Sequence, residues 1–232
     1  SVMGEQDDSR IEMVQFHQSY SYEDFIMGYR PDKDGFKLSY GVFYQFCKRA
    51  LNDLNRPYYF IIDEINRGNI SRIFGELLML IEADKRGEKY AVPLTYAESK
   101  FYVPDNLYII GTMNTADRSL AMLDYALRRR FCFINMEPAF NNLNFKGYLE
   151  NKNSDISDVI IDKINRLNKD IENDISLGRD FCIGHSYFCT GEDTLTEADY
   201  EDIVEYEILP LLSEYWFDDP DKVSQWQTKL LE

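Results

Sequence analysis

Residues 60–69 read FIIDEINRGN, an apolar run that ends at two adjacent carboxylates, Asp63 and Glu64. The aromatic and aliphatic residues at 58–62 predict a strand buried on both faces. Open α/β sheets bind ligands beyond the carboxyl ends of their strands, and Mg²⁺ takes one or two carboxylates beside phosphate oxygens and waters. We therefore expect Asp63 to hold a Mg²⁺ shell through water and Glu64 to orient or deprotonate an attacking water. The alternative is an acidic pair that caps the next segment.

A second apolar stretch, residues 107–111, also ends in polar residues, in the sequence GTMNTADRS (111–119). The amide of Asn114 can hydrogen-bond a γ-phosphate and an attacking water together, although asparagine more often simply makes a turn. Asp117 and Arg118 form a charged pair before the next predicted helix. This pair is either a local salt bridge or a contact between subunits.

An arginine cluster follows in LRRRF (127–131), where Arg128, Arg129 and Arg130 end a predicted helix. Cations at a helix carboxyl end suit its dipole, which is the simpler interpretation. The functional interpretation is an arginine finger, a guanidinium that one subunit donates onto a transferring phosphate of its neighbour. A finger acting in this way implies a ring or another closed oligomer.

Composition narrows the class of protein. The 232 residues are 44% hydrophobic and 15% aromatic, which fits a globular protein with one large domain or two small ones. The formal net charge of −16 argues against this chain alone binding a nucleic-acid backbone, which requires clustered Lys and Arg. With no apolar run of membrane-spanning length and no signal peptide at the start, we expect a cytoplasmic protein and no membrane partner.

The remaining pattern predicts an α/β part, residues 1–138, followed by a helical part, residues 139–232, with the change marked by Pro138. Further predicted elements of the first part are strands at 11–16 and 131–136 and helices at 41–54, 71–84 and 119–129, with Ser71 as the cap of the second helix. Residues 89–95 and 100–103 predict a hairpin with its turn around 97–99. Residues 17–31 predict a long ordered loop or a short helix. The predicted helices of the second part are 154–176, 197–215 and 219–231.

Several long blocks in this order resemble the AAA+ domain of McrB-type proteins, which are GTP-hydrolysing motor subunits of modified-cytosine-dependent restriction systems. The blocks are HQSYSYEDFIMGYRP (17–31), DEINRGN (63–69), VPLTY (92–96), FYVPDNLYIIGTMNTADRSLAMLDYALRRRF (101–131) and GHSYF (184–188). The similarity runs from about residue 11 to the end of the chain. It implies an AAA+ P-loop NTPase-like α/β core followed by an α-helical lid subdomain.

The resemblance also implies roles for individual residues. Asp63 and Glu64 match the Walker B acids and would hold the metal. Asn114 matches the sensor asparagine. Arg129 and Arg130 fall in the finger segment, and the resemblance does not decide which of the two reaches the phosphate. His185 lies where AAA+ lids carry a second sensor. With Asp63, the remaining candidates for contacting the nucleotide are Asp117, Arg118 and His185.

The same resemblance implies GTP rather than ATP, Mg²⁺, a hexameric ring and an McrC-type endonuclease partner. In the family, methylated DNA is sensed by a separate N-terminal domain, which is absent from this sequence. Two alternatives stay open. One is an AAA+ ATPase that remodels protein partners, and the other is a non-catalytic scaffold that assembles with intact copies.

A Walker A loop of the form GxxxxGK[ST] does not occur in residues 1–232. The backbone amides and lysine of that loop normally cradle the β- and γ-phosphates. In the family the loop and the central strand precede the position of residue 11. The core is therefore expected to be incomplete, either because the chain is part of a longer protein, which we favour, or because it is a degenerate form. Either way, the isolated chain should bind nucleotide poorly and be inactive.

Overall fold

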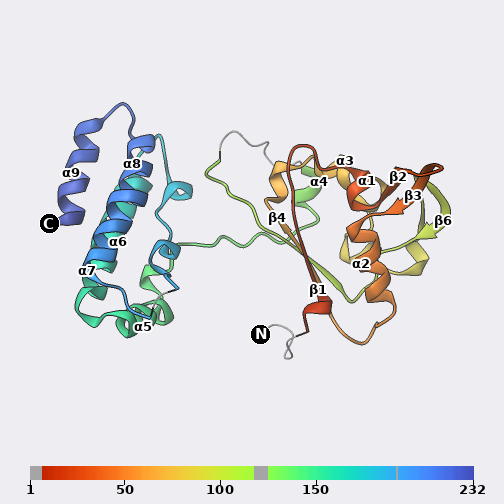
Figure 1. Ribbon diagram of the computed structural model, residues 1–232, viewed down its shortest axis with the longest axis horizontal. Coiled ribbons are helices and arrows are strands. Elements are labelled where there is room, and N and C mark those ends of the chain that lie inside the picture. The colour runs from red at the N-terminus through yellow and green to blue at the C-terminus, as the bar shows by residue number, and fades with distance from the viewer. Residues whose placement is uncertain (1–6, 118–124, 192) are drawn as a thin grey trace. The chain divides into compact units, whose positions relative to one another are not determined.

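The computed structural model describes residues 7–117, 125–191 and 193–232, and the chain divides into two units, Ser1–Phe133 and Ile134–Glu232 (Figure 1). The first unit is built on a parallel sheet with short helices and hairpins. The second unit is helical. Each unit has its own hydrophobic core, and the two clusters share no residue. The predicted fold class, an α/β core followed by a helical lid, is confirmed.

The sheet of the first unit has three parallel strands in the order β1-β4-β7. They are β1 (Ile11–Gln15), β4 (Tyr58–Asp63) and β7 (Leu107–Gly111). Central β4 pairs with β1 from Ile11↔Tyr59 onward and with β7 from Tyr58↔Leu107 onward. All three strands therefore run in one direction, and their carboxyl ends meet at one edge, as the sequence predicts.

The two faces of this sheet differ in burial, so the prediction of a strand buried on both faces is only half right. On one face of β4, Tyr58, Phe60 and Ile62 are at most 5% exposed. There Phe60 contacts the rings of Phe43 and Phe46 from α2 (Val42–Leu51). The other face carries more exposed apolar side chains, because no described element covers them: Met13, Tyr108 and Ile110.

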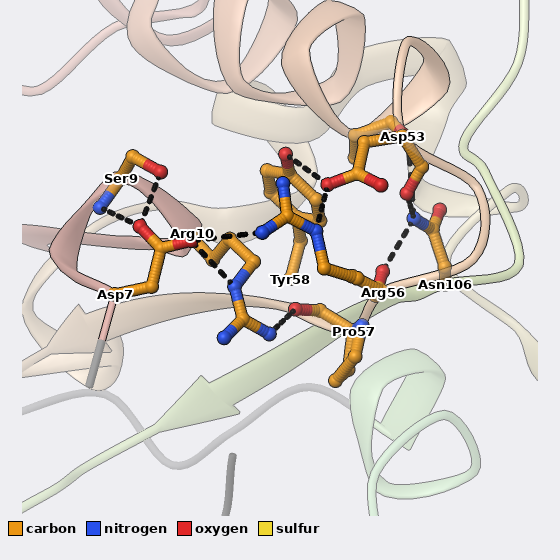
Figure 2. A network of polar contacts seen from close by, with 9 residues as sticks. Asp7, Ser9, Arg10, Asp53, Arg56, Pro57, Tyr58 and Asn106 are labelled. Atoms are coloured by element: carbon orange, nitrogen blue, oxygen red, sulfur yellow. Dashed lines mark hydrogen bonds and ion pairs between the residues drawn. The ribbon is translucent and has the colours of Figure 1, made fainter. Parts of the chain in front are cut away.

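A polar network ties together the amino ends of the three strands (Figure 2). The buried Arg10, just before β1, pairs with Asp7 at 3.0 Å and donates a hydrogen bond to the carbonyl of Pro57, just before β4. Asn106, just before β7, donates to the carbonyls of Asp53 and Arg56 at 2.9 and 2.8 Å. This network fixes the strands relative to one another, and it leaves their opposite ends available for a site.

The short helices of the first unit are α1 (Tyr22–Phe25), α3 (Ile70–Phe74) and α4 (Tyr125–Arg128). The predicted helix over 71–84 is wrong in both its start and its length. Asn69, whose side chain accepts a hydrogen bond from the Arg72 amide, is the N-cap in place of Ser71. The helix ends at Gly75, whose φ of 50° is left-handed, and 3-10 turns follow.

Two hairpins complete the first unit. The predicted hairpin is confirmed, with strands β5 (Val92–Leu94) and β6 (Ala97–Phe101), but the predicted turn at 97–99 is wrong, because those residues belong to β6. The other hairpin pairs β2 (Met27–Asp32) with β3 (Gly35–Tyr40). Most of β2 lies within residues 17–31, for which the sequence predicts a loop or a short helix. Its alternation of charged and aromatic residues gives a weak signal, because most of its side chains are exposed on both faces.

The predicted strand over residues 131–136 is wrong, because this stretch has no regular secondary structure. A strand needs a neighbour for its backbone N–H and C=O groups, and the described part of the chain supplies none here. Phe133, Ile134 and Met136 are exposed by 46%, 80% and 90%. Among the described residues, no strand pairs with the outer edge of β7 either.

The second unit is a helical bundle whose helices are α5 (Leu143–Lys152), α6 (Ser154–Asn173), α7 (Glu197–Ile203), α8 (Leu209–Tyr215) and α9 (Pro220–Leu231). A π-helical turn, Val204–Ile208, joins α7 to α8. The core face of α6 follows helical spacing through Ile160, Ile164, Leu167 and Ile171. The three predicted helices are confirmed, and α5 was not predicted. Within the described ranges, no helix has the length and apolar character needed to span a membrane.

Candidate functional site

The candidate site lies at the carboxyl ends of the three strands, where Asp63 is held from both sides. Thr112, just after β7, donates its hydroxyl to Asp63 Oδ1 at 2.5 Å. Gln15, the last residue of β1, donates its amide to Asp63 Oδ2 at 3.1 Å. Gln15 and Asp63 are register partners, so the sheet itself sets this contact. The sequence pattern does not single out Gln15 and Thr112, although each stands where its strand ends.

Glu64 sits in an unusual backbone conformation directly after β4. Its φ of 52° and ψ of 46° are left-handed, and no other described residue except glycine has a positive φ. Such a conformation costs on the order of 1–3 kcal/mol and occurs often at functional sites. The Oε2 atom of Glu64 is buried and lies 3.1 Å from Nε of Arg67, although the N–H is not aligned for a hydrogen bond.

The segment after β4 is joined to the segment after β7 by backbone contacts. The amide of Thr112 donates to the carbonyl of Ile62, and the amide of Ile65 donates to the carbonyl of Thr112, both at 2.9 Å. Asn66 donates its side-chain amide to the carbonyl of Asn114 at 3.3 Å. At Gly111, an added Cβ would lie 2.9 Å from Ile65 Cδ1, so a larger residue would require the Ile65 side chain to shift.

The structure thus brings Asp63, Glu64, Asn114 and Asp117 into one region. The side chain of Asn114 is exposed and accepts a hydrogen bond from the Ala116 amide at 3.0 Å, which is the turn-making role considered above. Asp117 lies 3.5 Å from the guanidinium of Arg67, a residue to which the sequence gave no role. Arg118 lies outside the described residues.

The arginines of the 127–131 cluster have different surroundings. Arg130 is 17% exposed and pairs with Glu82 of its own unit at 2.8 Å. Arg128 and Arg129 are exposed. An arginine already paired within its own unit is less available to a neighbouring subunit. Arg129 is therefore more available than Arg130 for a contact with a neighbouring subunit.

His185 belongs to the second unit, where it begins a 3-10 turn, His185–Phe188. Its Nδ1 accepts a hydrogen bond from the Ala139 amide at 3.1 Å, so the neutral ring carries its proton on Nε2. The ring also meets Phe145 edge to face at 5.2 Å. These contacts fix the ring within the lid and leave Nε2 as its remaining polar atom.

The oxygen donors at the strand ends fit a hard cation. Asp63 contributes a carboxylate oriented by two donors, and the Thr112 hydroxyl and the Asn114 amide lie on the adjoining loop. Mg²⁺ prefers this donor chemistry and keeps waters and phosphate oxygens as further ligands. Glu64 fits less well, because its carboxylate is engaged by Arg67. Among the described residues, no three His, Cys, Asp or Glu side chains form a metal-binding group, so a cation would also depend on ligand oxygens.

Comparison with known families matches residues 5–131, more than half of the chain, to the model described as AAA domain (dynein-related subfamily). The chain belongs to this AAA family. Residues 159–224 of the same AAA protein match the model described as McrB, alpha-helical lid domain. The resemblance to McrB-type AAA+ domains is thereby confirmed.

Two curated relatives are subunits or components of restriction enzymes. The type IV methyl-directed restriction enzyme EcoKMcrB subunit of Escherichia coli (strain K12) is 54% identical over 239 residues, covering 99% of this chain and 52% of the relative. The type II restriction enzyme BsuMI component YdiS of Bacillus subtilis (strain 168) is 29% identical over 132 residues, covering 51% and 38%. The chain therefore spans about half the length of the first relative and less of the second.

Among solved structures, a crystal structure of a candidate ATPase from Cytophaga hutchinsonii aligns with a TM-score of 0.36 at 15% identity. The alignment covers 68% of this chain and 46% of the other. So low a score carries no argument, and the family assignment depends on the sequence matches.

Proposed function

We propose that this chain is part of a nucleoside-triphosphate-hydrolysing motor subunit of a modification-dependent DNA restriction system, with GTP preferred over ATP. The observation that carries the proposal is the meeting of Asp63, Glu64 and the Asn114 loop at one edge of a parallel sheet. The 54% identity to an McrB subunit of a methyl-directed restriction enzyme supports the restriction context. The choice of GTP comes from the resemblance to McrB-type proteins.

Each residue has a distinct task under this proposal. Asp63, held by Gln15 and Thr112, anchors the hydration shell of Mg²⁺, which would supply charge neutralisation to the phosphates. Glu64 orients or deprotonates the attacking water, and the exposed amide of Asn114 hydrogen-bonds that water or the γ-phosphate. Asp117 and Arg118 are proposed to adjoin the nucleotide, and His185 to act as the lid sensor through its Nε2 proton.

We place the phosphate-cradling loop in polypeptide outside residues 1–232, because the motif is absent from them. Within the described residues, no strand pairs with the outer edge of β7, and the apolar side chains of Tyr108 and Ile110 are exposed. A further strand could pair and pack there, which supports this placement. The isolated chain should therefore bind GTP weakly. Tight binding by residues 1–232 alone would contradict this placement.

The test uses the protein that carries this chain together with its phosphate-binding loop, and compares wild type with Glu64→Gln. We expect Glu64→Gln to lower kcat by about 10²- to 10⁴-fold, because general-base catalysis contributes that much, while nucleotide binding and assembly persist. Hydrolysis is measured with GTP and ATP in parallel. Activity with ATP alone would favour the remodelling ATPase, and an unchanged rate in the variant would favour the scaffold.

Arg129 is our candidate for the finger acting across subunits, because it is exposed while Arg130 pairs with Glu82. Arg129→Met mixed with Glu64→Gln subunits should recover part of the activity, because some interfaces then join an intact base to an intact finger. Arg130→Met should instead lower thermal stability. Failure to recover activity at every mixing ratio would contradict the assignment of Arg129.

The finer partners follow from the same proposal. A finger acting in trans implies a ring or another closed oligomer, and we propose a hexameric ring. An McrC-type endonuclease would dock on that ring, and DNA would be recognised by a separate domain. Such a system would act in the cytoplasm, where the DNA is.

A further inference from the structure

Arg67 connects the segment that follows β4 to the loop that follows β7. Its Nε lies 3.1 Å from Glu64 Oε2, and its Nη2 lies 3.5 Å from Asp117 Oδ2. One guanidinium therefore pairs with a carboxylate that follows β4 and with another from the loop after β7. A planar guanidinium presents its N–H groups in fixed directions and can serve two carboxylates at once, whereas an ammonium is a single point charge.

The contacts beneath Arg67 fix the backbone but do not reach the Glu64 carboxylate. Ile65 and Thr112 are joined by a main-chain hydrogen bond, and Asn66 donates to the carbonyl of Asn114. In the part of the chain that the structure describes, the ion pair with Arg67 is the contact shown for the carboxylate of Glu64. The direction of that side chain thus depends on Arg67.

The environment of Glu64 makes this dependence strong. Its backbone is left-handed, and its Oε2 atom is buried without an aligned hydrogen bond. Withdrawing a charged oxygen from water is costly unless a counter-charge is near. Removing Arg67 would therefore leave the carboxylate free to turn toward solvent and away from its present place beside the Asn114 loop.

We propose that Arg67 is a positioning residue for hydrolysis, with Asp117 as its second anchor. Arg67 holds the Glu64 carboxylate in register with residues 112–117, so that the base and the Asn114 amide stay aligned on one water. This inference depends on the proposed function and assigns a role to a residue that the motifs alone left without one.

The first test measures hydrolysis by the protein that carries this chain together with its phosphate-binding loop. Arg67→Met should lower kcat by about 10- to 100-fold, because a misplacement of about 1 Å in a reacting group has effects of that size. KM should stay within about two-fold. Arg67→Lys should keep part of the activity, because an ammonium can pair with one of the two carboxylates.

Asp117 supplies a second arm of this test. Asp117→Asn should lower kcat less than Arg67→Met does, and the double variant should lose less than the product of the two single-variant factors, because Asp117 supports Glu64 in part through Arg67. The matched control is Arg166→Met, which removes an exposed Arg–Asp pair from the second unit and should leave kcat unchanged.

Binding of two analogues separates positioning from general damage. Arg67→Met should weaken binding of GDP with aluminium fluoride by the same factor as kcat and leave a non-hydrolysable GTP analogue unaffected. Equal losses for both analogues, a changed KM with an unchanged kcat, or additive effects of Arg67→Met and Asp117→Asn would each overturn the inference.

A last measurement does not depend on hydrolysis. In the 232-residue chain, a double-mutant cycle of Glu64→Gln and Arg67→Met should show a coupling of about two- to five-fold in the unfolding equilibrium constant. Absence of coupling would overturn the positioning role even in a protein that hydrolyses GTP. If the wild-type protein hydrolyses neither GTP nor ATP, the proposed function is wrong. This inference is then wrong as well, whatever coupling between Glu64 and Arg67 is measured.

Discussion

Residues 1–133 carry 19 acidic and 17 basic side chains, whereas residues 134–232 carry 22 acidic against 8 basic. The unit with the larger charge is not the one that holds the candidate site. In the first unit a few carboxylates gather where parallel strands end, beside a left-handed residue. The comparison teaches that the placement of an acid relative to the backbone, rather than the number of acids, marks a chemical site.

The same comparison applies to single carboxylates. Asp174 in the second unit accepts hydrogen bonds from Trp216 at 2.9 Å, Lys222 at 2.8 Å and Ser176. Its role is structural, because these donors tie the end of α6 to α8 and α9. Glu64 in the first unit has a buried oxygen with an ion pair but no aligned hydrogen bond. A saturated carboxylate stabilises a fold, whereas one with spare acceptor capacity can serve a ligand.

The largest expected effect tests whether the two cores are independent. Phe60→Ala should lower the free energy of unfolding of the first unit by about 3–5 kcal/mol, and Ile164→Ala that of the second by about 2–5 kcal/mol. Both residues are fully buried, and they belong to clusters that share no member. Unfolding in urea, followed by NMR signals from each unit, checks this. Equal shifts of both units by either variant would contradict separate cores.

A smaller effect concerns the acid dependence of the second unit. Hydrogen bonds from Lys222, Ser176 and Trp216 hold the pKa of Asp174 well below its usual range. A lowered folded-state pKa means that this stability is fully present above the ordinary aspartate pKa of about 3.9 and is lost as pH falls through the folded value. Asp174→Asn should therefore cost about 1–2 kcal/mol at pH 7, and the gap to wild type should narrow below about pH 4.

Thermal unfolding of the second unit between pH 7 and pH 2.5 measures that gap. The control is Asp162→Asn, which removes an exposed pair with Arg166 and should change stability by less than about 0.5 kcal/mol. A gap between wild type and Asp174→Asn that stays constant down to pH 2.5 would show that the stabilisation does not come from the ionised carboxylate.

Much of the fold could be predicted because apolar periodicity is a local property of the chain. The strands at β1, β4 and β7 and the long helices of the second unit all follow it closely. The prediction failed where a neighbour decides the outcome. Residues 131–136 read as a strand but have no described partner, and the predicted helix over 71–84 is interrupted at Gly75.

In the candidate site, too, some features follow from the sequence and others depend on tertiary contacts. The sequence by itself determined that acids and an asparagine follow two apolar strands, and that the arginine cluster comes next, because residue type and spacing are written in the chain. Only the tertiary structure decided that Gln15 and Thr112 clamp Asp63, that Arg67 reaches both Glu64 and Asp117, and that Arg130 is held by Glu82. The reason is physical: most of these contacts join segments brought together by parallel pairing, and the one local pair depends on a left-handed turn that spacing does not reveal.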